Sequence, residues 1–247
     1  MFRLLITSLL TVAAFLGQAQ KYIKPYVGIN FSNRILSSSN GQRKDSLDAA
    51  DKMRPSPSGG FQFLFEKNSG REFYFGFGYM ENTFMRERLN YQFLDTVHPD
   101  LGVIFDLSQA AQKNGYFKYH FKYFEIPLGV NLQVTPRQHM NLFTGWFNIG
   151  LNPQFLLKQN MIIQLQGFSM KGKNRFDFSN TGYEAAKFNV ALQTGGRFDY
   201  SLDKKTWVTA DALFKIQLIH TATSPNEKLR VFNFALNLGI KHEIGSY

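Results

Sequence analysis

Phe232-Asn233-Phe234-Ala235-Leu236-Asn237-Leu238-Gly239-Ile240-Lys241, close to the C-terminal end of the chain, is the stretch that decides the fold. Its large apolar residues occupy every second position, and small or polar residues occupy the positions between them. A period of two is that of an extended strand, because successive side chains of a strand point to opposite faces. The stretch therefore predicts a β-strand with one apolar face and one small or polar face.

The same two-faced pattern recurs along the chain and predicts eight strands. They cover residues 22–33, 58–67, 71–84, 117–134, 139–151, 187–200, 205–219 and 229–243. Turn-rich joints of hairpin length connect some of them, at 68–70, 135–138 and 201–204. Long segments near 34–57, 85–116 and 152–186, and a shorter one near 220–228, connect the others. This alternation predicts an all-β fold, an eight-stranded antiparallel up-and-down transmembrane β-barrel with its long loops extracellular.

Periodicity alone does not say which face points inward, and a soluble ligand-binding barrel with an apolar interior is the alternative. The polar face combines small and amide residues with a few charges of both signs, as in Asn189, Gln193 and Arg197. The apolar face carries no Lys or Arg in runs such as Phe61, Phe63 and Phe65. A cation at the membrane midplane would cost about 2 to 4 kcal/mol. We therefore expect the polar face inside, the apolar face against lipid, and localisation in the cell outer membrane.

Residues 1–19 form a separate element. Arg3 precedes an apolar run, and small residues end it at Gly17 and Ala19. This pattern predicts a cleavable secretory signal peptide, with an N-terminal anchor helix as the alternative. The chain has no cysteine, which argues against a lipoprotein anchor and a disulfide framework. Residues 20–247 then form one domain, a barrel that we expect to be monomeric.

The formal net charge of +10 concerns the partners of the chain. In a secreted protein, a basic balance favours anionic lipid, lipopolysaccharide phosphate or acidic glycan as partner over nucleic acid. The densest cluster, Lys171, Lys173 and Arg175, falls in the third long loop. We take these three residues as a candidate loop binding patch, with ordinary solvated loop charge as the alternative.

Seven ionisable residues fall on the predicted inward face. They are Glu66, Glu125, Arg197, Asp199, Asp211, Lys215 and Lys241. The interior of an eight-stranded barrel is just wide enough to be filled by side chains. Buried charges must be paired, because an uncompensated one costs several kcal/mol. The seven residues therefore predict a salt-bridged plug, and a conducting pore or proton path is the alternative.

Sequence motifs for other chemistry are weak. The five histidines show no metal-ligand spacing, so we expect no metal and no cofactor. His220, Ser224 and Glu227 share one rim loop, but a catalytic triad is defined by geometry that spacing does not supply. We expect no enzymatic activity, with a lipid-modifying enzyme as an alternative. Apolar residues at 155–157, 161–163 and 176–178 indicate an extension of the fifth and sixth strands above the membrane, or a docking surface.

The segment Tyr123-Phe-Glu-Ile-Pro-Leu-Gly-Val130 has two features of interest. Apolar residues occupy odd positions before it, from Tyr119 to Tyr123, and even positions from Phe124 onward. This change of phase predicts a bulge or a crossing of the membrane rim near Tyr123 and Phe124. The segment also resembles the fourth-strand signature of the outer-membrane β-barrel family of Bacteroidota that includes PorT-like proteins. The eight-strand plan is similar to the transmembrane domain of OmpA.

The resemblance implies an outer-membrane barrel, and some PorT-like members are implicated in type IX protein secretion. It leads us to expect a non-enzymatic accessory or structural component of the envelope that serves secretion. Its expected partners are outer-membrane lipid, lipopolysaccharide, and envelope or secretion-machinery proteins. A surface adhesin or receptor that binds ligands through the extracellular loops is the alternative, because shared barrel features specify a scaffold rather than a site.

Overall fold

The computed structural model describes residues 20–38, 51–67, 70–91, 113–135, 142–165, 175–176, 184–224 and 227–245. The strands are β1 (Gln20–Ser38), β2 (Asp51–Lys67), β3 (Arg71–Tyr91), β4 (Lys113–Glu125), β5 (Leu128–Gln133), β6 (Phe143–Leu165), β7 (Arg175–Phe176), β8 (Glu184–Ala185), β9 (Phe188–Ser201), β10 (Thr206–Gln217), β11 (Ala222–Ser224) and β12 (Glu227–Gly245). Among the described residues, no helix is long and apolar enough to cross a membrane. The predicted signal peptide, residues 1–19, lies outside the described residues.

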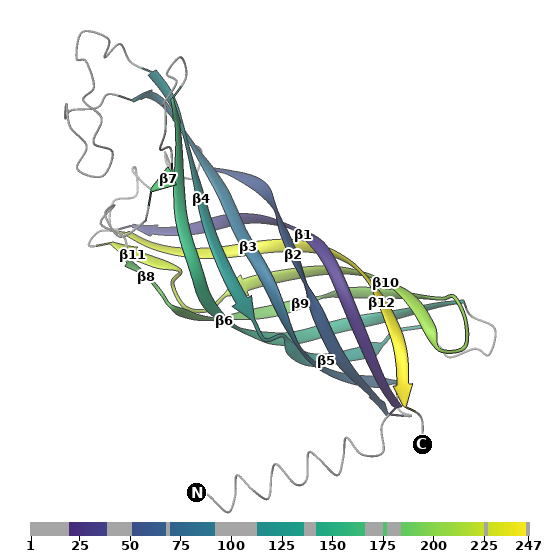
Figure 1. The fold of residues 1–247 in the computed structure, drawn as a ribbon. Helices are drawn as coiled ribbons and strands as arrows, with labels where there is room; N and C mark the ends of the chain where they lie inside the picture. The colour runs from purple at the N-terminus through teal and green to yellow at the C-terminus, as the bar shows by residue number, and fades with distance from the viewer. Residues whose placement is uncertain are drawn as a thin grey trace, which may run out of the picture.

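The strands close into an antiparallel barrel (Figure 1). The order around the wall is β1-β2-β3-β4-β6-β9-β10-β12, and β1 pairs along its length with β12. We call each strand position around the wall a stave. β4 and β5 together occupy one stave, because both lie between β3 and β6. The break between them falls at Pro127, which has no N–H to donate. The wall therefore has eight staves, and the predicted fold class is confirmed.

The two faces of the wall are chemically opposite. In the stretch around Asn237, the residues Phe234, Leu236, Leu238 and Ile240 are exposed, whereas Asn233, Ala235, Asn237 and Lys241 are buried. The same division holds in the other staves, where the exposed large hydrophobic residues include Phe73, Phe75, Phe77, Phe147, Ile149 and Leu151. A polar interior inside an apolar outer surface excludes the soluble barrel, whose apolar face would point inward.

The strands are longer than the alternation predicted. β3 has 21 residues and β6 has 23, whereas about 9 to 11 residues cross a membrane. The predicted loops near 34–57, 85–116 and 152–186 therefore contain strand residues, and β11 and the start of β12 fall within 220–228. Beyond the membrane the wall no longer faces lipid, so the apolar alternation that marked the strands is lost there. The other residues of the three long loops lie largely outside the described ones.

The apolar residues at 155–157 and 161–163 continue the fifth predicted strand, β6, as an extension of the wall. The extension pairs with β4, from Glu125↔Gln154 to Gly115↔Leu165, and the short β7 pairs with its far end. On the returning side of this extension, Phe176 in β7 pairs with Met161, and β9 begins at Phe188.

The predicted bulge near Tyr123 does not lie on β4 itself. Tyr119, Phe121 and Tyr123 are buried, and so is Glu125 two residues further on, so one parity points inward throughout. The inward residues themselves change in character, from aromatic at Tyr119, Phe121 and Tyr123 to polar at Glu125. A bulge does occur here, but on the neighbouring strand: the partner of Lys122 is Lys158 and that of Tyr123 is Leu156.

Candidate functional site

All seven predicted lumen residues are buried, with exposed fractions from 1% for Arg197 and Glu125 to 7% for Asp211. They come from five staves and form two groups along the barrel axis. One group lies near the end of the barrel where β1 begins and β12 ends, which is called the end of the termini below, and the other lies deeper.

The group near the termini is centred on Glu72, which is fully buried. Arg197 donates from Nη2 to Glu72 Oε2 at 3.1 Å and to Asp199 Oδ2 at 3.0 Å. Lys241 Nζ lies 2.6 Å from Glu72 Oε2 and 3.8 Å from both Glu66 Oε2 and Asp199 Oδ2. Charges of both signs are thus held together where solvation is weak, and this makes removal of one member costly.

Aromatic rings enclose the two cations of this group. The Arg197 guanidinium lies 4.9 Å from the ring centroid of Trp146. Lys241 Nζ lies 4.1 Å from the ring centroid of Tyr22 and 5.5 Å from that of Trp207. A cation over an aromatic face is attracted by the ring quadrupole, most strongly when desolvated.

The deeper group consists of two ion pairs that span the lumen. Lys24 Nζ lies 3.1 and 3.0 Å from the two carboxylate oxygens of Asp211, and Lys215 Nζ lies 2.8 and 3.0 Å from those of Glu125. All four side chains are at most 6% exposed.

Amide side chains fill a further part of the lumen. Gln193 donates to Asn148 Oδ1 at 2.7 Å and to Tyr74 Oη at 3.1 Å. Asn148 in turn donates to Asn131 Oδ1 at 2.6 Å, and Asn131 donates to Glu72 Oε1 at 2.6 Å. The amides thereby connect to the charged group near the termini.

Aromatic and apolar side chains block the lumen further from the termini. Met80, Phe84, Phe121 and Tyr123 are each at most 1% exposed. The Phe84 ring stacks on that of Tyr119, with centroids 4.9 Å apart. Beyond these rings, Arg34 and Arg86 share the carboxylate of Asp51. Among the described residues, charged, amide and aromatic side chains thus follow one another along the lumen.

Sequence reasoning missed several members of this interior. Glu72 lies on the strand face opposite to the outward Phe73 and Phe75, and Lys24 lies on the same face as the buried Tyr22 and Tyr26. The alternation of the strands could therefore have placed both residues in the lumen. Arg34, Asp51 and Arg86 had been assigned to loops, and only the true strand ends reveal them.

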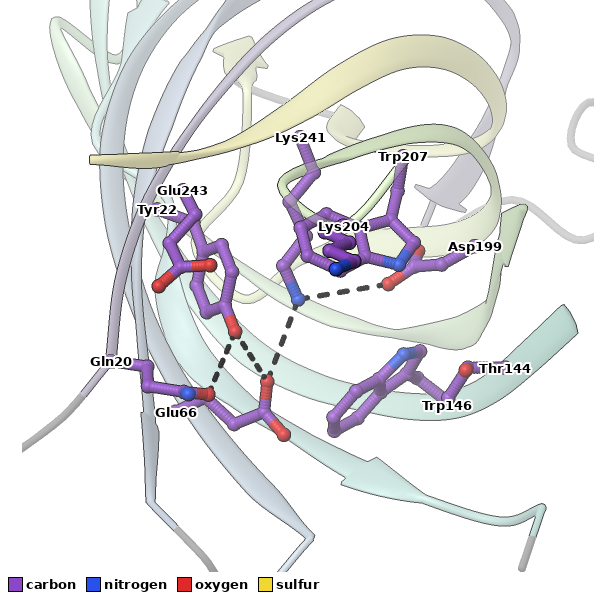
Figure 2. Close-up of a pocket in the computed structure, with 10 residues that line it drawn as sticks. All are labelled: Gln20, Tyr22, Glu66, Thr144, Trp146, Asp199, Lys204, Trp207, Lys241 and Glu243. Atoms are coloured by element: carbon purple, nitrogen blue, oxygen red, sulfur yellow. Dashed lines mark hydrogen bonds and ion pairs between the residues drawn. The ribbon is translucent and has the colours of Figure 1, made fainter. Parts of the chain in front are cut away.

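A recess of about 330 Å³ lies beside the charged group near the termini (Figure 2). Its lining is Gln20, Tyr22, Glu66, Thr144, Trp146, Asp199, Lys204, Trp207, Lys241 and Glu243. Tyr22 Oη lies 3.0 Å from Gln20 Oε1 and 3.2 Å from Glu66 Oε2, two acceptors for its single proton, and Lys241 approaches the centre of the recess. The recess combines aromatic faces with charges of both signs, which suits a polar ligand rather than an apolar one.

The remaining candidate residues are less well defined by the structure. Lys171 and Lys173 lie outside the described residues, and Arg175 begins β7 with a side chain that is not described. Ser224 pairs with Glu227 across the β11–β12 hairpin, again without described side chains. His220 is described, and its partial burial, together with the nearby cations Arg230 and Lys228, lowers its pKa below the ordinary value. No group of three His, Asp or Glu residues that could hold a metal ion occurs in the described ranges.

The closed antiparallel wall, its polar interior and its apolar outer belt define a transmembrane β-barrel of the outer-membrane class. No protein-family model and no curated protein matches the sequence.

Several solved structures are similar to the chain. A major outer membrane protein from Thermus thermophilus has a TM-score of 0.45 at 11% identity, covering 91% of this chain and 99% of its own. OprG from Pseudomonas aeruginosa has 0.43 at 11%, covering 93% and 98%. Neisserial surface protein A has 0.43 at 10%, covering 91% and 97%. Similarity at this level assigns neither a family nor a function to the chain.

Proposed function

We propose that this protein is a non-enzymatic, non-conducting outer-membrane barrel that acts as an accessory or structural component of the envelope. The observation that carries the proposal is the filled lumen. Buried ion pairs such as Lys215–Glu125 and the buried rings of Phe84 and Phe121 succeed one another along the axis. An eight-stranded barrel has no room for a path around such side chains, so its function lies at its ends and on its outer surface.

The end away from the termini offers the larger surface. β3 and β6 are about twice as long as a membrane crossing needs, and the β4–β6 pair continues to Gly115↔Leu165. Long strands outside the membrane present edges and faces on which partner proteins can dock. The end with the termini offers the recess around Lys241.

The secretion role rests on the PorT-like resemblance of residues 123–130. In that segment Tyr123 and Glu125 are buried in the lumen, and Phe124 faces outward. These residues serve barrel packing, so the resemblance supports a shared scaffold, and the role in type IX secretion is our proposal from the family.

Deletion of the gene tests the secretion role. Normally secreted cargo should accumulate in the periplasm of the deletion strain, and the wild-type gene should restore its release. A second variant lacks only residues 168–174 of the third long loop and keeps the strand residues on both sides. It distinguishes a role of this loop in secretion from a role of the barrel itself. An unchanged secretome in the deletion strain would contradict the secretion role.

A surface adhesin or receptor is the second candidate, and the wall that extends beyond the membrane favours it. The candidate loop patch of Lys171, Lys173 and Arg175 would then meet an acidic glycan or lipopolysaccharide. In that case loss of residues 168–174 abolishes binding of cells to the ligand while secretion continues normally.

A further inference from the structure

We propose that Lys122 on β4 and Lys158 on β6 form a binding site for the phosphate group of an outer-leaflet lipid. The site lies on the outer wall of the barrel. The assignment to the outer leaflet rests on the proposed function as an outer-membrane barrel, with its long loops, and so the extended strands that carry them, extracellular.

A row of phenylalanine rings lies just below this site. The ring centroids are 6.1 Å apart for Phe77 and Phe124, 6.5 Å for Phe124 and Phe155, and 5.3 Å for Phe155 and Phe188. The four rings cross β3, β4, β6 and β9, and each is between 36% and 44% exposed. An exposed aromatic row of this kind faces the acyl chains of lipid.

Polar residues begin immediately beyond the row. On β4, the outward positions after Phe124 are Lys122, His120 and Lys118, because the residues between them point into the lumen. On β6, the bulge that follows Phe155 ends at the exposed Lys158. The change from phenylalanine to lysine places these ammonium groups at the depth of the lipid headgroups.

Lys122 and Lys158 are direct partners in the β4–β6 register. Like charges directly opposite each other on neighbouring strands are destabilising. Both side chains are accessible, Lys158 being exposed and Lys122 being 33% exposed. An anion between the two ammonium groups would turn this repulsion into two attractive contacts.

The surrounding charges leave the cations in excess. The nearby carboxylate is that of Glu81, which lies 2.6 Å from His120 Nδ1, 3.1 Å from Tyr79 Oη and 3.8 Å from Lys122 Nζ. In the described part of the chain, neither Lys118 nor Lys158 has a carboxylate within ion-pair distance. Of these lysines, only Lys122 thus lies near a carboxylate, and that carboxylate is already engaged by His120 and Tyr79.

A lipid that carries a phosphate group fits both parts of this surface, the lysines and the phenylalanine row. The phosphate oxygens accept hydrogen bonds from the lysines, which bind phosphate as point charges. The acyl chains of the same molecule lie along the phenylalanine row. Free phosphate would use only the lysines, so the two sources of phosphate are separable.

The test measures retention of lipid A by the detergent-solubilised, folded protein with native mass spectrometry. Lys122→Gln/Lys158→Gln should retain at least about tenfold less lipid A than the wild type, because two charge-assisted contacts are lost. The control, Lys67→Gln/Lys205→Gln, removes the same charge from two exposed positions at the opposite end of the barrel, outside the lining of the recess, and should retain lipid A normally. Lipid A stripped of both phosphates should not be retained.

Three results would overturn the proposal. They are undiminished retention by the Lys122/Lys158 variant, an equal loss in the control variant, and equal retention of dephosphorylated lipid A. Displacement of lipid A by millimolar inorganic phosphate would overturn the lipid part alone.

Folding can be separated from binding in this test. In a zwitterionic detergent without lipid A, the Lys122/Lys158 variant should unfold at the same or a higher temperature than the wild type, because a repulsion is removed. An unchanged secretome in the deletion strain would contradict the secretion role and leave these lipid results untouched.

Discussion

Arg197 and Glu72 lie 125 residues apart in the sequence, on staves β9 and β3, and their side chains meet across the lumen in a two-point ion pair. Two parallel hydrogen bonds fix both the distance and the orientation of the guanidinium. Because Lys241 and Asp199 join the same pair, one region of the lumen ties together three staves, β3, β9 and β12. This cross-link explains how a polar interior stabilises a barrel whose outer surface gains little from packing against itself.

Replacing Glu72 with Gln should lower the free energy of unfolding by about 3 kcal/mol, because the fully buried Arg197 and Lys241 each lose a carboxylate partner. Urea unfolding of the barrel in micelles measures the effect. Glu243→Gln, the same chemical change at the half-buried rim of the recess, is the control and should cost at most about 1 kcal/mol. Equal stabilities of the two variants would contradict a role for buried pairing.

Asp211→Ala should lower the heat resistance of the folded barrel, because it strands the buried ammonium of Lys24. The double variant Lys24→Met/Asp211→Ala should recover part of the loss, because it also removes the stranded charge. Electrophoretic mobility after graded heating follows the folded fraction. A double variant with the summed loss of both single variants would show that the two residues are not coupled.

Gly150 leaves room for the hydroxyl end of Tyr74 against the lumen wall. A Cβ at position 150 would lie 2.2 Å from Tyr74 Oη and 2.7 Å from the carbonyl oxygen of Leu128. Gly150→Ala should therefore destabilise the barrel by about 1 to 3 kcal/mol through overpacking. Tyr74→Phe in the same chain removes the nearer atom and should relieve part of the strain. Urea unfolding of the single and double variants checks this, and full additivity of the two changes would contradict it.

The pKa of His220 should lie below the ordinary 6.5, because partial burial and the cations Arg230 and Lys228 disfavour its protonation. As the pH falls through the ordinary value, the unfolded chain binds a proton that the folded chain does not bind. His220 therefore contributes stability above that pH, and this contribution is lost toward acid. An NMR titration in micelles measures the pKa, which Arg230→Gln should raise. A value above 6.5 in the wild type would instead point to a carboxylate beside the ring.

The alternation of residues 232–241 predicted the strand period, because lipid contact imposes the same contrast along each stave. The order of short and long connections predicted the antiparallel plan, and the absence of Lys and Arg from the apolar runs predicted the membrane-facing side. The strand ends at Ser38, Tyr91 and Leu165 were missed, because outside the membrane both faces of a strand can be polar. The sequence itself carries no other marker of these ends.

The lumen was predicted only in part. Glu125 and Lys215 were both expected inside, but their pairing with each other depends on how the barrel closes. The inward direction of Tyr119, Phe121 and Tyr123 was not predicted, since an apolar residue satisfies a filled lumen as well as it satisfies lipid. These three residues alternate in step with Glu125, so the inward position expected for Glu125 would have placed them in the lumen as well.

Electrical recording from planar bilayers is the most direct test of the filled lumen. The folded protein, verified by its heat-dependent mobility, should give no stepwise conductance above that of the bare bilayer, and a general porin in the same bilayer serves as the positive control. Resolved conductance steps that scale with the amount of folded protein would show an open path, and they would contradict both the filled lumen and a function confined to the barrel ends and outer surface.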